Sequence, residues 1–287
     1  MEPMDWPTVR TWRKAARAKV IAARVAVPAT LRDPWTKALI AELRPILLHA
    51  PQPISFYWPL KAEPDLRPLM RELDDFGIEI CLPVALRLGE PMTFRPWNRG
   101  MPLTRGLWNI PIPATDKEVE PRTLIAPFVA FDDQYRLGYG GGFFDRTLEK
   151  FGATARAIGI GFSMFRLPTI HPQPHDIPMR QILTEEGEQV RSEDGTVTED
   201  RDVAAAAEIT QPLAALTPAL PEELKPLADF IQWRLDGEAA EPATQLSPGQ
   251  AEKALRQAVA SGRPVPCRTA LRALLAGIDR FAAIKFA

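Results

Sequence analysis

Two neighbouring stretches decide the fold, Thr123-Leu-Ile-Ala-Pro-Phe-Val-Ala-Phe131 and Arg136-Leu-Gly-Tyr-Gly-Gly-Gly-Phe-Phe-Asp145-Arg146. The first is a continuous apolar run, which predicts a buried strand. The second is rich in glycine and leads into residues 145–151, where the pattern predicts a helix. A strand, a glycine-rich loop and a helix in this order direct backbone N–H groups and the positive end of the helix dipole at an anion.

The glycine-rich loop predicts a phosphate site. Four of its five consecutive residues 138–142 are glycines, so the backbone is bare enough to wrap an anion. Arg136 adds charge, and Asp145 is suited to hold a metal ion or to serve as the N-cap of the helix. The loop lacks the lysine–hydroxyl pair of a Walker loop and does not match Gly-x-Gly-x-x-Gly. The alternative is a flexible turn that only needs positive φ angles.

Composition restricts the class of protein. The chain has 287 residues, a formal net charge of −1 and a pI of about 6.4. This charge balance argues against a protein whose whole surface binds nucleic acid. Cys81 and Cys267 lie far apart, which suits a reducing compartment and provides no disulfide framework. No apolar stretch approaches the roughly 20 residues of a membrane span, so we expect a cytoplasmic protein without nucleic-acid or membrane partners.

Strand and helix patterns alternate from residue 8 to residue 162. This alternation predicts an α/β fold with an open, mainly parallel sheet flanked by helices, in a Rossmann-like three-layer arrangement. Ligands of such sheets bind at the carboxyl ends of the strands. Glu63, the loop after Phe131 and the segment after Phe162 all follow predicted strands. We therefore expect these three segments to converge on one site.

The composition changes after Thr184. We expect an α/β domain over residues 1–186, a polar linker over residues 187–202 and a helical C-terminal extension over residues 203–287. Three alanine- and leucine-rich segments of the extension, 222–235, 248–260 and 269–286, are compatible with amphipathic helices. Their apolar faces must be buried on the main domain or against a second copy, so self-association through the extension is one expectation.

The predicted opening helix, Thr8 to Val27, carries a positive stripe. Arg10, Arg13, Lys14 and Arg17 follow i, i+3, i+4, i+7 spacing and share one face. Such a stripe is either a solvated surface or a site for an anion.

Four segments together resemble the 5-formyltetrahydrofolate cyclo-ligase family, also called methenyltetrahydrofolate synthetase. The strongest resemblance is in Pro127-Phe-Val-Ala-Phe-Asp132 with the glycine-rich loop. The other three segments are Arg13-Lys-Ala-Ala-Arg17, Tyr57-Trp-Pro-Leu-Lys-Ala-Glu63-Pro-Asp65 and His175-Asp176-Ile-Pro-Met-Arg-Gln-Ile-Leu-Thr184-Glu185. The resemblance covers Thr8 to about Glu186, and nothing beyond belongs to it.

The resemblance implies roles for individual residues. Those implied to bind ATP are Arg13, Lys14, Arg17, Arg136, Leu137, Gly138, Tyr139, Gly140, Gly141, Gly142, Phe143 and Phe144. It leaves open which of Arg13 and Lys14 contacts phosphate. Arg136 and Asp145 are the catalytic candidates, and Asp145 and Asp176 are the candidate Mg2+ ligands; the role of Asp176 rests on the resemblance alone.

The reduced folate is implied to bind at a second set of residues. They are Tyr57, Glu63, Trp108, Tyr139, Gly140, Gly141, Gly142 and Phe143. A carboxylate at Glu63 can accept two N–H groups from the pterin. Tyr57 and Trp108 can stack on a flat heterocycle, and the alternative for both is ordinary core burial.

The implied reaction is ATP- and Mg2+-dependent conversion of 5-formyltetrahydrofolate to 5,10-methenyltetrahydrofolate, with release of ADP and phosphate. Two departures from the family pattern stand out: Gly141 where a lysine is frequent, and Phe144 where a tyrosine is frequent. Two alternatives remain open. One is a non-catalytic protein that binds nucleotide or folate and acts through its helical extension. The other is a different nucleotide- or sugar-phosphate-using enzyme, because fold does not determine function.

Overall fold

A computed structural model describes residues 4–189, 222, 225–227, 229, 230 and 233. The α-helices are α1 (Trp6–Ala26), α2 (Ala29–Leu48), α3 (Arg67–Asp75) and α4 (Phe143–Phe151). The strands are β1 (Ile54–Ser55), β2 (Ile80–Val84), β3 (Thr93–Trp97), β4 (Leu103–Arg105), β5 (Pro111–Pro113), β6 (Thr123–Pro127), β7 (Ala130–Phe131), β8 (Arg136–Leu137), β9 (Arg156–Ile160), β10 (Gln181–Thr184) and β11 (Gly187–Gln189). Short 3-10 helices are η1 (Leu107–Asn109), η2 (Gly152–Thr154) and η3 (Ser163–Phe165).

The main sheet of the described chain has seven strands in the order β11-β10-β9-β6-β1-β2-β3. The five inner strands are parallel, and the edge strands β3 and β11 pair antiparallel with their neighbours. The predicted open, mainly parallel α/β sheet is therefore confirmed. β4 with β5 and β7 with β8 form two separate hairpins.

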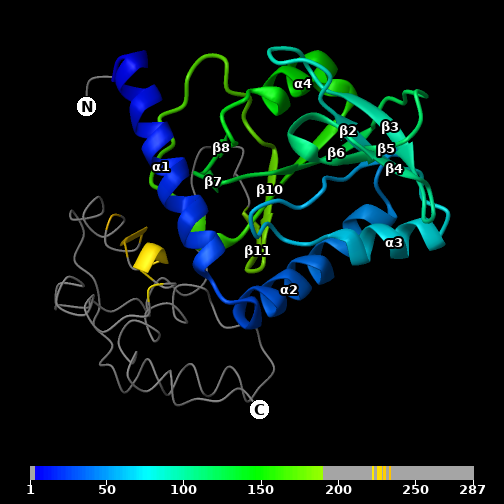
Figure 1. Ribbon diagram of the computed structural model, residues 1–287, viewed down its shortest axis with the longest axis horizontal. Helices are drawn as coiled ribbons and strands as arrows, with labels where there is room; N and C mark the ends of the chain where they lie inside the picture. The colour runs from blue at the N-terminus through cyan, green and yellow to red at the C-terminus, as the bar shows by residue number, and fades with distance from the viewer. Residues whose placement is uncertain (1–3, 190–221, 223–224, 228, 231–232, 234–287) are drawn as a thin grey trace.

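Side chains of the inner strands alternate between two apolar clusters on opposite faces of the sheet. On one face α2 and α3 pack on Ile125 and Ile158. On the other face α4 packs on Leu124 and Ala126. Figure 1 shows α2 and α3 on one side of the strands and α4 on the other, which is the predicted three-layer arrangement.

α1 belongs to a third apolar cluster, away from both sheet faces. It begins after Asp5, whose side chain accepts a hydrogen bond from the N–H of Thr8 at 3.1 Å, and it ends before Pro28. Its apolar side packs on the β7–β8 hairpin and on the segment after β9, through residues such as Ala16 and Val20. α1 therefore lies against the edge of the sheet where the parallel strands end.

One predicted element is divided in the structure. The apolar run from Thr123 to Phe131 forms two strands: β6 belongs to the main sheet, whereas β7 pairs with β8. The division comes after Pro127, which ends β6, and it turns the chain toward α1. Within the described residues, no helix is long and apolar enough to cross a membrane.

Most of the predicted linker and extension lies outside the described residues. β11 runs from Gly187 to Gln189, beyond the expected domain edge at residue 186. The described residues between 222 and 233 are helical apart from Glu222, which lies in a 3-10 turn. The domain boundaries and the extension as a whole stay predictions.

Candidate active site

Three segments meet at the edge where the parallel strands end, as the strand order predicted. They are residues 57–63 after β1, the β7–β8 hairpin with its glycine-rich loop after β6, and residues 161–176 after β9. α1 connects them because Arg24 donates to Lys61 and Phe128, Arg17 donates to Gly138, and Arg13 donates to Ile170 and His171. The site is therefore built between one helix and three loops.

The glycine-rich loop turns sharply into α4. Gly140 and Gly142 have positive φ angles of 94° and 65°. A Cβ atom at Gly140 would lie 3.2 Å from the Arg17 guanidinium, and one at Gly142 would lie 2.7 Å from Nη1 of Arg146. Both glycines therefore provide the turn and leave room for arginines. The first N–H groups of α4 have no acceptor within the helix and are available to an anion.

Arg136 is buried beneath this loop. Its Nη2 donates to Oδ1 of Asp145 at 3.1 Å, and its guanidinium lies 4.9 Å from the centre of the Phe144 ring. Burial lowers the pKa of Arg136, while the charges of Asp145 and Asp176 oppose the shift. Nε of Arg136 is buried without a hydrogen-bond partner among the described residues. This arginine is a fixed cation with a free donor.

Asp145 lies in the first turn of α4, and Gly142 holds the N-cap position. The N-cap alternative for Asp145 is therefore wrong. The carboxylate instead pairs with Arg136, and its side chain keeps 23% of its surface exposed. Asp145 can consequently contact both Arg136 and a ligand.

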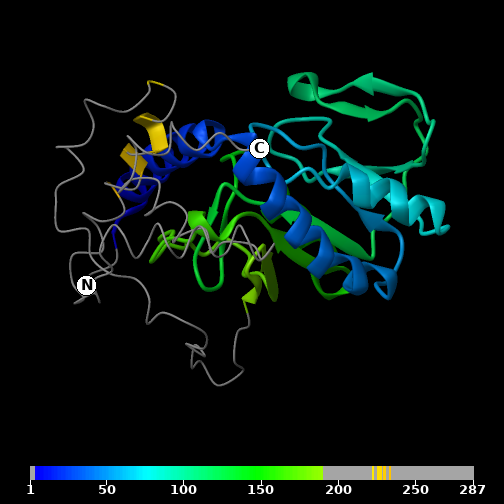
Figure 2. The same cartoon turned by 90° about the horizontal axis from the view of Figure 1, so that it is seen from below.

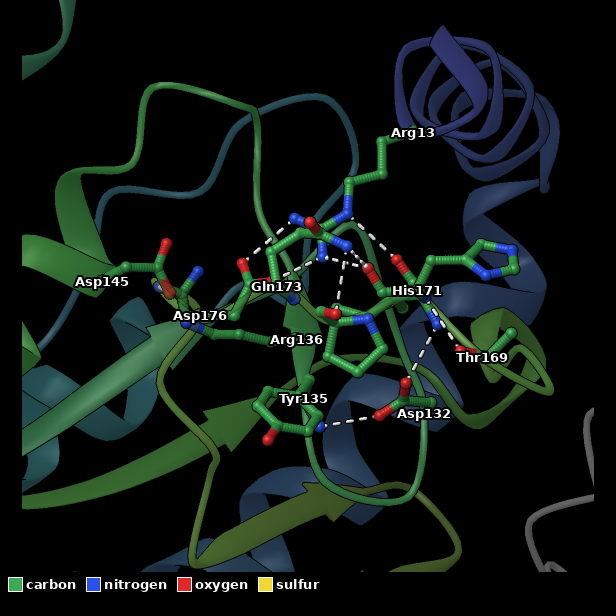
Figure 3. A network of polar contacts seen from close by, with 11 residues as sticks. Arg13, Asp132, Tyr135, Arg136, Asp145, Thr169, His171, Gln173 and Asp176 are labelled. Carbon is green, nitrogen blue, oxygen red and sulfur yellow. Dashed lines mark hydrogen bonds and ion pairs between the residues drawn. The ribbon is translucent and has the colours of Figure 1, made fainter. Parts of the chain in front are cut away.

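Arg13 reaches from α1 to Asp176, 163 residues further along the chain. Its Nη1 and Nη2 donate to the two carboxylate oxygens at 3.0 and 2.5 Å. Figure 3 shows Arg13 extending from the helix to this carboxylate, with Arg136 and Asp145 beside the pair. Although burial raises the pKa of Asp176, hydrogen bonds from Arg13 and the backbone of Gln173 lower it below its ordinary value. Lys14 is exposed, whereas Arg13 is buried and paired with Asp176.

Two further arginines cover the glycine-rich loop. Nε of Arg17 donates to the carbonyl of Gly138 at 2.7 Å. Burial and the neighbouring Arg13 lower the pKa of Arg17, against the opposing charges of Asp176 and Asp145. Arg146 folds back from α4, donates to the carbonyl of Gly141, and lies 5.7 Å from the centre of the Phe143 ring. Arg146 thus brings a cation to the position where the chain has Gly141.

A second, buried network lies on the other side of Tyr139. The Tyr139 hydroxyl donates to Oε1 of Glu63 at 2.9 Å and accepts from Nη2 of Arg24 at 2.5 Å. Oε2 of Glu63 accepts from the N–H of Leu60 at 2.8 Å. Burial raises the pKa of Glu63, although Arg24, the Leu60 N–H and Tyr139 lower it in part. Tyr139 therefore joins the glycine-rich loop to the predicted folate carboxylate.

The aromatic candidates differ in position. Tyr57 is buried in the main apolar cluster, and its hydroxyl donates to the carbonyl of Pro64 at 2.7 Å. Tyr57 is therefore a core residue in the structure, which is the second of its two predicted alternatives. Trp108 lies on the β4–β5 hairpin, is exposed, and meets the Phe143 ring edge-on at 5.4 Å. Trp108 and the exposed side of Tyr139 each offer a ring to a flat ligand, whereas Tyr57 does not.

The carboxylates fit a magnesium ion that binds together with phosphate. Mg2+ usually takes one or two carboxylates and completes its shell with phosphate oxygens and waters. Asp145 and Asp176 both lie close enough to Arg136 and Arg17 to shift their pKa values, so the two carboxylates share one region. The described residues contain no group of three or more metal-binding side chains. The arrangement therefore suits a metal that needs ligands from the nucleotide.

Two residues of the network were not among the predicted site residues. Arg24 is 1% exposed and bonds to three separate segments, including Tyr139. Its sequence signal was present, since Arg24 follows Arg17 by seven residues and extends the same helix face. Asp132 is also buried and accepts from the backbone of Gln134, Tyr135 and Ile170, which joins the β7–β8 turn to the segment after β9. An acid in a turn carried no specific signal for this role.

The fold and the site define an α/β protein with an arginine-lined, glycine-rich loop beside a buried carboxylate. Residues 9–185 match the 5-formyltetrahydrofolate cyclo-ligase family. A 5-formyltetrahydrofolate cyclo-ligase of Mycolicibacterium smegmatis is 31% identical over 178 residues, which cover 58% of this chain and 91% of that protein. A 5-formyltetrahydrofolate cyclo-ligase of Escherichia coli is 28% identical over 139 residues, which cover 46% of this chain and 76% of that protein. The NMR structure of Aquifex aeolicus 5,10-methenyltetrahydrofolate synthetase has 26% identity and a TM-score of 0.56, covering 67% of this chain and 98% of that one.

The chain belongs to the 5-formyltetrahydrofolate cyclo-ligase family, and it is an enzyme of the ligase class. The resemblance seen in the sequence is confirmed. The family match stops at residue 185, so the residues beyond the sheet are outside it.

Proposed function

We propose that the chain converts 5-formyltetrahydrofolate to 5,10-methenyltetrahydrofolate with consumption of ATP, release of ADP and phosphate, and a requirement for Mg2+. The observation that carries this proposal is the position of Tyr139. One side of this residue continues into the glycine-rich loop, and its hydroxyl donates to Glu63 at 2.9 Å. The residues to which we assign phosphate and the residue to which we assign the heterocycle are thus neighbours.

The reaction needs positioning and charge neutralisation more than a protein nucleophile. ATP, when bound, supplies the phosphoryl group that makes the formyl oxygen a phosphate leaving group. N10 of the folate then closes the ring on the formyl carbon as phosphate leaves. Phosphoryl transfer of this kind depends mainly on orientation and electrostatic stabilisation by the protein.

The arginines around the loop are suited to that task. Arg136 is fixed by Asp145 and Phe144 and keeps Nε free, while Arg17 and Arg146 lie over the loop backbone. A buried cation acts more strongly on a developing negative charge than an exposed one, because water screens it less. We assign phosphate binding to these three arginines and to Arg13.

Asp145 and Asp176 are the residues that we propose hold Mg2+. Each carboxylate is neutralised by an arginine in the absence of ligand, Asp145 by Arg136 and Asp176 by Arg13. A bound Mg2+ would supply neutralisation of the phosphate charge. Arg136 keeps its Nε as a donor for phosphate while it pairs with Asp145.

Glu63 is the residue that we propose recognises the pterin. It is 5% exposed, and a carboxylate in such a position can accept two N–H groups of a planar heterocycle. Arg24 offsets part of the cost of burying this charge, since its Nη2 lies 3.8 Å from Oε1 of Glu63. Trp108 and the ring of Tyr139 are the available stacking surfaces.

Turnover of 5-formyltetrahydrofolate, followed by the absorbance of the methenyl product, tests the proposal. We expect product only when ATP and Mg2+ are both present, in a one-to-one ratio with ADP. Binding of both ligands without product would support the regulatory alternative. Turnover of a nucleotide or a sugar phosphate, with no turnover of 5-formyltetrahydrofolate, would support the alternative of a different phosphate-using enzyme.

The remaining partner and location assignments are proposals as well. We propose reduced folate as the small-molecule substrate and a cytoplasmic location, which suits the buried thiol of Cys81. Self-association through the extension remains a proposal, because most of residues 203–287 lie outside the described part.

A further inference from the structure

A short segment beyond the sheet packs on α1. The described residues of this segment are Glu222, Lys225, Pro226, Leu227, Asp229, Phe230 and Trp233. Figures 1 and 2 both show it, in yellow, beside α1. Leu227, Phe230 and Trp233 are three residues apart, so in a helix they share one face. These three residues are called the brace below.

The brace fills the space between α1 and the segment after β9. Leu227 and Phe230 are each 1% exposed and belong to the same apolar cluster as Ala16 and Val20 of α1. The Phe230 ring lies 5.4 Å from the ring of Phe165, which belongs to η3. The brace therefore touches both elements that flank it.

Its aromatic contacts continue toward the candidate ATP site. The ring centres of Trp233 and Trp12 lie 6.1 Å apart, and the Trp12 ring meets the ring of His171 edge-on with 4.5 Å between the ring centres. The next residue of α1 is Arg13, whose Nη2 donates to the carbonyl of His171 at 2.9 Å. The brace and Arg13 thus hold the same two elements together, one through apolar contacts and the other through hydrogen bonds.

The position of Arg13 depends on this junction. Its Nε donates to the carbonyl of Ile170 at 3.0 Å, and Ile170 is fully buried in the cluster that contains the brace. A shift of α1 against residues 163–171 would break these bonds and move the guanidinium away from Asp176. Well-packed clusters transmit such shifts because they contain few voids.

We propose that the brace is a positioning element for ATP: it fixes α1 against residues 163–171 and thereby sets Arg13 at the nucleotide site. The inference rests on the proposed function, since it assigns Arg13 to phosphate binding. It concerns residues that the family match does not cover. The brace itself touches no reacting group, so its effect appears in ATP affinity and not in the chemistry.

The test uses the full chain with Phe230→Ala and, as a milder change, Trp233→Leu. ATP affinity is measured by titration calorimetry, and KM for ATP and for 5-formyltetrahydrofolate is measured separately. We expect ATP affinity to fall about three- to thirtyfold, the range for substitutions along a coupled network, while KM for the folate changes less than twofold. Should Phe230→Ala fail to fold, Trp233→Leu carries the test.

The matched control is Leu73→Ala in α3. Leu73 is fully buried in the apolar cluster between the sheet and helices α2 and α3. The substitution should lower the melting temperature and leave ATP affinity unchanged. If Phe230→Ala also lowers only the melting temperature, the brace is merely structural and the inference is wrong. Failure of the wild-type chain to bind ATP would instead refute the proposed function.

A double-mutant cycle sharpens the result. Once Arg13 is replaced by alanine, Phe230→Ala should cost little further ATP affinity, because the residue that it positions is gone. Additive losses from the two substitutions would show that the brace acts by another route and would overturn the proposal.

Discussion

Arginines near the two ends of α1, Arg13 and Arg24, take part in two ion-pair regions that differ in exposure. At the phosphate end, the pairs Arg13–Asp176 and Arg136–Asp145 keep part of their carboxylate surface exposed. At the folate end, Arg24, Tyr139 and Glu63 form one network in which both charged side chains are 2% exposed. One end is open to ligand, whereas the other is closed around its charge.

The difference suits the two ligands that we propose for these ends. ATP and Mg2+ carry charges of their own, so they can replace the partners of Asp145, whose side chain keeps 23% of its surface exposed. A pterin is neutral and offers N–H donors, so the protein must keep a charged acceptor in a dry environment. Holding that carboxylate ionised requires fixed partners, and three segments of the chain provide them through Arg24, Tyr139 and Leu60.

The largest effect is expected at the open end, for Asp145→Asn. The amide keeps the shape of the side chain but removes the charge that we assign to Mg2+, so kcat should fall about a hundred- to a thousandfold, as for other losses of transition-state charge stabilisation. Activity should be measured against Mg2+ concentration. Glu149→Gln, an exposed acid on the same helix, is the control. Near-normal kcat with unchanged Mg2+ dependence would remove Asp145 from the metal site.

At the closed end, Glu63→Gln should raise KM for the folate about ten- to a hundredfold, the range for a hydrogen bond to a charged group. The dissociation constant of ATP should stay nearly constant, because Glu63 is separated from the loop arginines by Tyr139. The control is Asp65→Asn, which changes a half-exposed acid paired with Arg67. Equal losses for folate and ATP would show that the two ends are not separate sites.

The glycine-rich loop is tested by Gly142→Val. Valine strains the positive φ and its Cβ meets Arg146, so ATP affinity should fall about tenfold, in line with the usual cost of such strain. Gly77→Val is a matched control, because Gly77 also has a positive φ, of 79°, but a Cβ there meets open space. Both variants should lose stability. If both retain wild-type ATP affinity in calorimetry, the loop glycines serve the turn alone.

The smallest effect is expected for Tyr139→Phe, and it should depend on pH. Loss of the hydroxyl removes a hydrogen bond that lowers the pKa of Glu63, so this pKa, already raised by burial, rises further. Glu63 is ionised only above its pKa, and Arg24, Lys61 and Tyr57 are the other ionisable groups that act on it.

KM for the folate should therefore begin to rise at a higher pH in Tyr139→Phe than in the wild type as the pH is lowered, and the two values should converge at high pH. A pH profile of KM for both proteins provides the measurement. An increase by the same factor at every pH would mean that Tyr139 acts through contact with the ligand and not through Glu63.

The sequence by itself predicted the alternation of strands and helices that builds the main sheet. Apolar runs such as Ile78 to Val84 and the spacing of charges on α1 have short periods, and local periods specify helices and strands. The glycine-rich loop after a strand predicted an anion site, and the motif pattern led to the correct family. The patterns for helices, strands and the glycine-rich loop are local, whereas the family resemblance combines four such local segments.

The tertiary structure alone decided which charges meet. Arg13 and Asp176 are 163 residues apart, and Arg24 and Tyr139 are 115 apart, so no local pattern relates them. Their pairing depends on the strand order and on the turn after Pro127, which places β7 and β8 under α1. The same packing buries Arg24 and exposes Lys14, although both lie on one helix. Ionisable side chains acquire their roles from burial and from distant partners, and those are properties of the folded chain.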